Sequence, residues 1–325
     1  MAIVKPFKGI MYNSSSGSDV SDKVSPPYDV INPKLQTELY VKDPDNIVRI
    51  ILGKEEANDE GDEIYQRASG YYQNWKAEKV LIRDKKPAFY VWDQTFTVKG
   101  TEFIRRALVG KVRCLPFHKR EVIPHEKTHK GPKIDRLKLF QSCETQFSQV
   151  FSLYSDKDGN IAKLLKKYTK TPLLTAKYDG ITNHLYRVTA PGGLDKLQAE
   201  FKKQSLYIAD GHHRYETSVT YFEEKNKEGS TLMTLVAKED AGLTILPTHR
   251  AVSSSVSDFI AYQRLNRIFV IQKGNFAEWP EYLEKLNQMD GIHVFAFANR
   301  KLGISGIMKP LEPLEYAAPW DERKE

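Results

Sequence analysis

The sequence predicts an α/β fold of the mixed α+β kind, in which mixed sheets contain hairpins. Three observations predict it. Apolar runs rich in β-branched and aromatic residues are interspersed with segments of helical periodicity. Two pairs of strand-like runs are joined by the short turns Lys99-Gly100 and Asp179-Gly180, which are typical of hairpins. From residue 192 onward, strands and helices alternate regularly.

The first part of the chain combines short strands, a stiff loop and two helices. Three prolines exclude a helix through residues 23–33, and apolar residues at helical spacing indicate a helix at 62–77. The elements expected in order are a strand at 3–13, a loop at 23–33, a helix at 33–40, a strand at 46–53, an acidic connector at 55–63, a helix at 62–77, a hairpin at 88–114, and a segment at 120–143 that becomes helical near Lys133.

The second part alternates more regularly. The elements expected in order are a strand at 146–154, a helix at 160–168, a hairpin at 172–190, a helix at 194–203, a strand at 205–210, a helix at 212–226, strands at 231–239 and 243–252, a helix at 256–268, a strand at 269–274, a helix at 279–289 and strand-like residues at 292–308. The Pro191-Gly192-Gly193 break suggests an N-terminal lobe at 1–191 and a C-terminal lobe at 192–325.

Composition favours a cytoplasmic globular protein. Hydrophobic residues make up 40% of the chain and the formal net charge is +7. The sequence contains no apolar run of transmembrane length and no signal peptide, and its two cysteines do not form a zinc motif. The positive residues are spread along the chain, which favours a small anionic metabolite or nucleotide over nucleic acid as the partner. Oligomeric state is left open.

A polar run, Asp-Gly-His-His-Arg at residues 210–214, lies where a predicted strand meets a predicted helix. The first amides of a helix lack intrahelical partners and carry partial positive charge, so a helix start binds anions. Gly211 lets a ligand approach the backbone, and Arg214 adds a forked donor for phosphate or carboxylate oxygens. We therefore predict that Gly211, His213 and Arg214 bind phosphate or nucleotide.

The same run supplies acid–base groups. Asp210 is expected to accept a proton or to hold a divalent metal ion, and His212 to orient or protonate a phosphate. The structural alternative is that Asp210 only caps the helix and Arg214 pairs with Glu216 or Asp210 on a solvated surface. Cations at a helix start oppose its dipole, and this conflict favours a bound anion.

A second polar run begins at His125. Pro124 and Gly131-Pro132 bracket it and predict a loop. We expect His125 and Lys133 to bind substrate, and Glu126 to act as a catalytic carboxylate. The spacing of His125 and His129 would suit zinc on a helix, but the flanking residues favour the loop. A solvated charged loop is the structural alternative.

Two shorter motifs complete the predicted site. The proline-stiffened run at 25–30 presents Tyr28 and Asp29, which are expected to contact substrate because a rigid loop loses little entropy on binding. A packed turn is the alternative. The run Leu-Pro-Thr-His-Arg at 246–250 ends in His249 and Arg250, which are expected to form a second anion contact.

Residues 205–220 resemble the phosphate-binding box of the ParB/sulfiredoxin superfamily. That group contains the nucleotide-binding domains of chromosome-partitioning proteins, sulfiredoxins, and ADP-dependent free-serine kinases with a closely similar Asp-Gly-His-His-Arg run. His213 and Arg214 match the phosphate-contacting pair. His212 stands where sulfiredoxins have their reactive cysteine, so the resemblance does not extend to sulfiredoxin chemistry.

A larger resemblance covers most of the chain. The runs at 25–31, 125–137, 208–218 and 246–250 are similar to hallmarks of the bacterial domain-of-unknown-function family ten-fifteen. That family has no firmly assigned activity. Its members continue past the last residue of this chain, which leaves open whether the C-terminal lobe is truncated.

These residues predict a nucleotide-dependent phosphotransferase acting on a small hydroxylated metabolite, with Mg²⁺ and ATP or ADP as expected cofactors. The resemblance implies free serine as the first acceptor to consider. The alternatives are a phosphoserine phosphatase-like hydrolase and a non-catalytic nucleotide-binding switch. A nuclease is less well matched, because the run at 210–214 supplies one carboxylate. The glycine-rich nucleotide loops and the nucleophile elbow of hydrolases are absent from the sequence.

Overall fold

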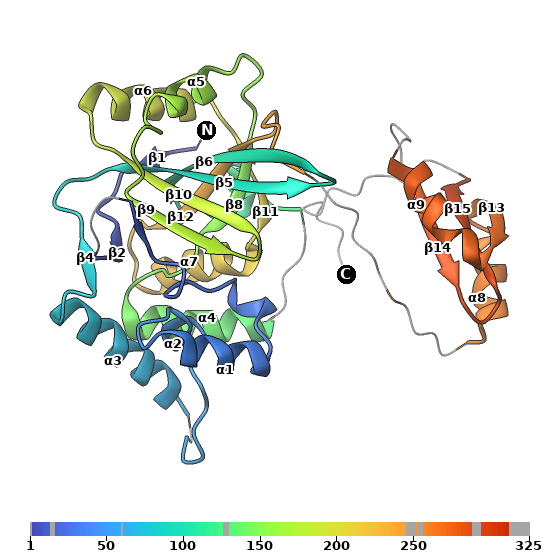
Figure 1. Cartoon of the computed structure of the whole chain (residues 1–325), viewed down its shortest axis with the longest axis horizontal. Coiled ribbons are helices and arrows are strands. Elements are labelled where there is room, and N and C mark those ends of the chain that lie inside the picture. The colour runs from blue at the N-terminus through green and yellow to red at the C-terminus, as the bar shows by residue number, and fades with distance from the viewer. Residues whose placement is uncertain are drawn as a thin grey trace. The chain divides into compact units, whose positions relative to one another are not determined.

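The computed structural model describes residues 2–13, 17–59, 61–125, 130–244, 251, 256–287 and 294–311. The chain divides into two compact units, Met1–Thr244 and Ile245–Glu325 (Figure 1). Both units combine strands with helices, which confirms the predicted mixed α/β class.

The first unit is built on a 10-stranded mixed sheet with the order β3-β9-β10-β5-β6-β12-β8-β11-β7, and β1 pairs with β6. Parallel pairs join β3 to β9, β12 to β8 and β11 to β7, and the other pairs are antiparallel. The strands are β1 Val4–Lys5, β3 Ser18–Asp19, β5 Phe89–Val98, β6 Thr101–Arg113, β7 Val122–Ile123, β8 Val150–Tyr154, β9 Leu174–Tyr178, β10 Ile181–Val188, β11 Leu206–Asp210 and β12 Ser230–Ala237. A separate antiparallel pair consists of β2 Ile10–Tyr12 and β4 Leu81–Arg83.

Both predicted hairpins are confirmed. Lys99 and Gly100, between β5 and β6, have φ angles of +49° and +81°. Asp179 and Gly180, between β9 and β10, have φ angles of +47° and +73°. Two successive residues with positive φ are typical of the tight turn whose twist matches that of paired strands, and this explains the glycine at each second position.

Helices cover the sheet on both sides (Figure 1). Figure 1 shows α5 and α6 on one side and α1 to α4 with α7 on the other. The largest apolar core joins the sheet to α5 and α6, and a second core joins α3 to α4. The helices are α1 Pro33–Lys42, α2 Val48–Ile51, α3 Glu63–Ala77, α4 Lys130–Cys143, α5 Asn160–Lys166, α6 Pro191–Phe201 and α7 His212–Glu224.

The strand predicted at 46–53 is wrong, because residues Val48–Ile51 form the short helix α2. The side chain of Asn46 accepts a hydrogen bond from the backbone N–H of Val48 at 3.0 Å, the contact of an Asx turn, just before this helix. Val48, Ile50 and Ile51 are buried. Burial among neighbouring helices therefore outweighs the β preference of these branched residues.

The sequence suggests a lobe boundary near residue 191, whereas the compact units divide after Thr244. Strand β11 pairs with β7 and β8, and β12 pairs with β6 and β8, so strands that follow residue 191 complete a sheet begun before it. The Pro-Gly-Gly run instead opens α6.

The described residues of the second unit form a three-stranded antiparallel sheet of order β13-β15-β14 and two α-helices. Its elements are α8 Asp258–Leu265, β13 Phe269–Asn275, α9 Trp279–Asn287, β14 Phe295–Asn299 and β15 Ile304–Pro310. Across the described part of the chain, no helix combines the length and apolar character that crossing a bilayer requires.

Candidate functional site

The candidate site surrounds the end of β11 and the start of α7. Strand β11 ends at Asp210, Gly211 has a φ of +94°, and α7 begins at His212. Glycine adopts this left-handed conformation without the strain that a Cβ atom brings, so the turn needs it. His212 and Tyr215 are buried and anchor the first turn of the helix.

Arg214 lies across this turn. Its guanidinium forms an ion pair with the Asp210 carboxylate and donates a hydrogen bond to the backbone carbonyl of Gln149. A Cβ atom on Gly211 would come within 2.9 Å of the Arg214 Cζ atom. The group that approaches the Gly211 backbone here is therefore the Arg214 side chain and not a ligand. The pairing of Arg214 with Asp210, left open by the sequence, is the one found.

Two histidines far apart in the sequence meet beside the turn. The backbone N–H of His125 donates to Nε2 of His212 at 3.1 Å, and Nδ1 of His125 lies 2.7 Å from the carbonyl oxygen of Ile208. The two rings are nearly perpendicular, with centroids 4.5 Å apart. The structure thus brings the predicted residues His125 and His212 together.

These contacts decide which ring nitrogens carry protons. A carbonyl oxygen only accepts, so Nδ1 of His125 must carry the hydrogen. In the neutral ring, Nε2 of His125 then holds the lone pair that a general base uses. Nε2 of His212 is an acceptor and is buried within the fold. His125 is exposed, so of the two it is better placed to meet a substrate.

Lys133 and Tyr28 have structural contacts that the sequence did not reveal. Lys133, on α4, forms an ion pair with Glu216 on α7 at 2.6 Å, which ties the two helices together. Tyr28 lies in a 3₁₀ turn at Tyr28–Val30, with the guanidinium of Arg136 4.0 Å above its ring. Burial raises the pKa of Tyr28, while Arg136 and Arg214 act in the opposite direction. Asp29 is exposed.

Arg136 was not among the predicted site residues. It donates to the Asp135 carboxylate from Nε at 2.6 Å and from Nη1 to the carbonyl oxygen of Ile51 at 2.8 Å. The one available signal was its helical spacing from Lys133, three residues earlier, which places both on one side of α4. That Arg136 lines the same cavity as Arg214 could not be inferred without knowing how α4 packs on α7.

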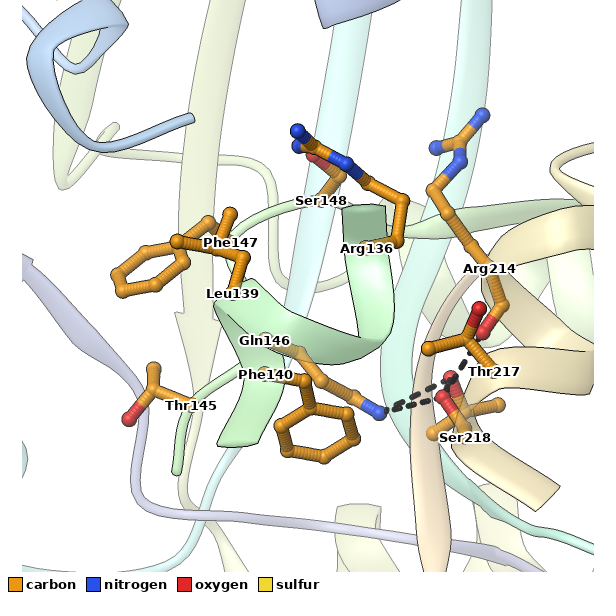
Figure 2. Close-up of a pocket in the computed structure, with 11 residues that line it drawn as sticks. Arg136, Leu139, Phe140, Thr145, Gln146, Phe147, Ser148, Arg214, Thr217 and Ser218 are labelled. Carbon is orange, nitrogen blue, oxygen red and sulfur yellow. Dashed lines mark hydrogen bonds between the residues drawn. The ribbon is translucent and has the colours of Figure 1, made fainter. Parts of the chain in front are cut away.

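A cavity of about 50 Å³ lies between α4, α7 and the segment that leads into β8 (Figure 2). Figure 2 shows the guanidinium groups of Arg136 and Arg214 extending toward the same end of it. Gln146 closes another side by donating to Ser218 at 2.8 Å and to Thr231 at 3.3 Å. The residues that line the cavity are Arg136, Leu139, Phe140, Thr145, Gln146, Phe147, Ser148, Arg214, Thr217, Ser218 and Thr231.

Thr217 also lines this cavity, and the sequence analysis missed it. Its side chain stands one turn after Arg214 on α7 (Figure 2). Only 4% of the residue is exposed, and its Oγ1 atom has no hydrogen-bond partner among the described residues. Buried hydroxyls normally have a partner, so this one is a candidate ligand contact.

Three predicted residues, Glu126, His249 and Arg250, lie outside the described residues, as does His129 of the zinc alternative. Within the described ranges, no three His, Cys, Asp or Glu side chains gather as a metal site would require. Asp210, the predicted metal ligand, is exposed and paired with Arg214.

The comparisons with known proteins identify a family but no activity. Residues 4–303 match the family DUF1015, described as a protein of unknown function. Searches of curated proteins and of solved structures found no match. The likeness of residues 205–220 to the ParB/sulfiredoxin box therefore finds no support in these searches and stays a prediction. The match covers most of the 325 residues, and the chain belongs to the DUF1015 family.

Proposed function

We propose that this chain is a nucleotide-dependent phosphotransferase that acts on a small hydroxylated metabolite. The observation that carries the proposal is the meeting of His125 with the turn at Asp210–Arg214. An imidazole, a carboxylate and a guanidinium lie together there at the start of a helix. Phosphoryl transfer depends mostly on positioning and charge neutralisation, which such groups supply.

In this proposal Arg214 and the first amides of α7 hold the phosphates of the nucleotide. Arg214 would exchange its contacts with Asp210 and the Gln149 carbonyl for phosphate oxygens, which accept two parallel hydrogen bonds from a guanidinium. Breaking the ion pair with Asp210 costs little free energy, because the Asp210 carboxylate is mostly exposed and water solvates it once it is released. The phosphate-binding role implied by the resemblance of residues 205–220 to the ParB/sulfiredoxin box would then apply to this chain.

The reaction would transfer the terminal phosphoryl group to the acceptor. As the acceptor hydroxyl oxygen bonds to phosphorus, the bond from phosphorus to the bridging oxygen breaks and the shortened nucleotide leaves. The hydroxyl proton passes to a base, and Nε2 of His125 is the best placed among the described residues. His212 is a positioning residue, because its ring accepts the His125 backbone N–H. Glu126 and Asp210 remain alternative bases.

We expect Mg²⁺ to bind this site only together with the nucleotide. Proteins bind Mg²⁺ through one or two carboxylates together with substrate phosphates, and Asp210 is one exposed carboxylate. Asp210 would therefore hold a nucleotide-bound ion, and the ion would neutralise charge on the transferred phosphoryl group.

Ligand-dependent thermal stability tests the proposal first. We expect ATP or ADP with Mg²⁺ to raise the melting temperature, and serine to be phosphorylated by the nucleotide that binds. CTP and phosphoserine complete the set of ligands. Replacing Arg214 by Ala should abolish the nucleotide effect, whereas unchanged stabilisation would remove this turn from consideration. Binding without any product would favour the nucleotide switch, and release of phosphate from phosphoserine would favour the hydrolase.

Two histidine variants, one in the site and one outside it, test whether His125 is the general base. His125→Gln should lower kcat about 10²–10⁴-fold, the usual contribution of a general base. His118→Gln is the matched control, since His118 is also exposed but lies in the 3₁₀ turn at Phe117–Lys119. If both variants keep the wild-type kcat and its pH profile, His125 is not the base.

A further inference from the structure

We infer that the cavity between α4 and α7 is a subsite for the carboxylate group of the acceptor, so that the acceptor is a small hydroxy acid. The identity of the ligand as the acceptor rests on the proposed function, whereas the assignment of the cavity to a carboxylate does not. No residue of the cavity other than Arg214 belonged to the predicted site.

The cavity is positively charged because of how its ion pairs are oriented. The side chains of Arg136 and Arg214 are 10% and 15% exposed, but those of their partners Asp135 and Asp210 are 41% and 61% exposed. The positive ends therefore lie inside, and the negative ends face water. Each guanidinium is paired only with a carboxylate that water reaches, and water weakens such a pair, so an anionic group inside the cavity would interact with the arginines more strongly.

The hydroxyl of Thr217 points to the same conclusion independently. Thr217 lines the cavity, and its Oγ1 atom is buried and has no hydrogen-bond partner in the described part of the chain. Leaving such a group unsatisfied destabilises the free protein. An oxygen atom of a ligand would accept its proton, and Ser148 offers a second hydroxyl on the cavity wall.

The size of the cavity limits what enters. A volume of about 50 Å³ is far below the roughly 300–1,000 Å³ of pockets that enclose whole drug-sized ligands. One small charged group fits, while the remainder of the molecule lies outside. The guanidinium of Arg136 and the hydroxyl-bearing residues Ser148 and Thr217 match the few oxygens of a planar carboxylate. Because Arg214 borders both the cavity and the turn at Gly211, the acceptor hydroxyl can lie near the proposed phosphates.

Thr217 allows a test with a matched control. Thr217→Val removes the hydroxyl and keeps the shape of the side chain. Thr234→Val does the same at a second buried hydroxyl without a partner among the described residues, which is on β12 and does not line the cavity. We expect both variants to melt at or above the wild-type temperature, because each loses an unsatisfied group.

Their binding properties should differ. Serine and glycerate are the carboxylate probes, and ethanolamine and glycerol are their counterparts without a carboxylate. By calorimetry, Thr217→Val should bind serine or glycerate about tenfold more weakly than wild type, the loss expected for one hydrogen bond to a charged group. Thr234→Val should bind like wild type, and Thr217→Ser should keep most of the affinity. The counterparts should bind far more weakly to every form.

The inference is overturned if serine and glycerate bind no better than their counterparts, or if Thr217→Val binds them as Thr234→Val does. Inorganic phosphate that binds more tightly than either acid, and weakens only in Thr217→Val, would assign the cavity to phosphate instead. Nucleotide binding measured on the same proteins separates the two proposals. If the protein binds the carboxylate probes but no nucleotide, the phosphotransferase proposal is refuted and the subsite stands. If it binds a nucleotide but not the carboxylate probes, only the subsite is refuted.

Discussion

The first unit contains two kinds of arginine–carboxylate pair, which differ in whether the arginine or the carboxylate is the more buried partner. Within the sheet, Arg106 on β6 donates to both oxygens of Asp93 on β5 at 2.8 and 2.6 Å, and only 7% of the Asp93 side chain is exposed. At the cavity, the side chains of Arg136 and Arg214 are only 10% and 15% exposed, while their carboxylate partners face solvent. The first arrangement is neutral inside the protein, and the second leaves positive charge inside.

This difference distinguishes an ion pair that only stabilises the fold from arginines whose charge a ligand can use. Asp93 and Arg106 face each other across paired strands, so the register of the hairpin holds both in place. Hydrogen bonds to Asp93 raise the pKa of Arg106, as expected for a charge that is satisfied internally. The carboxylates at the cavity are instead replaceable, because water can solvate them when an anion takes their position.

The largest effect on stability is expected in the sheet. Asp93→Asn removes the buried partner of Arg106 and should lower the free energy of unfolding by about 3 kcal/mol, near the lower end of values for breaking buried pairs. Urea denaturation followed by circular dichroism measures it. A loss below about 1 kcal/mol would place this pair in the same class as surface pairs and remove the contrast.

A smaller effect is expected at the cavity. Asp210→Asn should change the free energy of unfolding by less than about 1 kcal/mol, because the Asp210 carboxylate is mostly exposed. In the absence of Mg²⁺, the variant should bind ATP at least as tightly as wild type, since Arg214 no longer has an internal anion. Titration calorimetry without Mg²⁺ measures this, and a marked loss of affinity would mean that Asp210 holds Arg214 in its binding position.

The smallest effect is expected at the pair of Arg67 and Asp59. Two hydrogen bonds from Arg67 lower the pKa of Asp59 to about 2. A carboxyl whose pKa is lowered on folding stabilises the protein above its ordinary value of 3.8, and this contribution is lost as the pH falls toward 2. Arg67→Gln should return the pKa of Asp59 toward 3.8 in an NMR titration. An unchanged pKa would show that Arg67 is not the cause.

Local sequence patterns predicted most elements of the first unit. The hairpins follow from residues that adopt positive φ at the turns, and α3, α5, α6 and α7 follow from helical periodicity and from Pro and Gly at their ends. The failure at α2 has a clear cause. A β-branched run of a few residues does not distinguish a strand from a buried helical turn, and packing decided between them.

The candidate site was predictable only in part. The polar runs around His125 and Asp210 are visible in the sequence, but nothing in it places the His125 ring against the Ile208 carbonyl, 83 residues away. Arg136 and Thr217 gave weaker signals, because a charged residue and a threonine on helices are usually at the surface. Their importance depends on the packing of α4 against α7.

By itself, the sequence determined the mixed α/β class, the hairpin turns and the polar turn between strand and helix, because these depend on the conformational preferences of neighbouring residues. Only the tertiary structure decided that β11 and β12 complete a sheet begun much earlier, and that two arginines and a buried threonine line one cavity. Such contacts join residues distant in sequence, and their free energy comes from burial and pairing that exist only once the chain has folded.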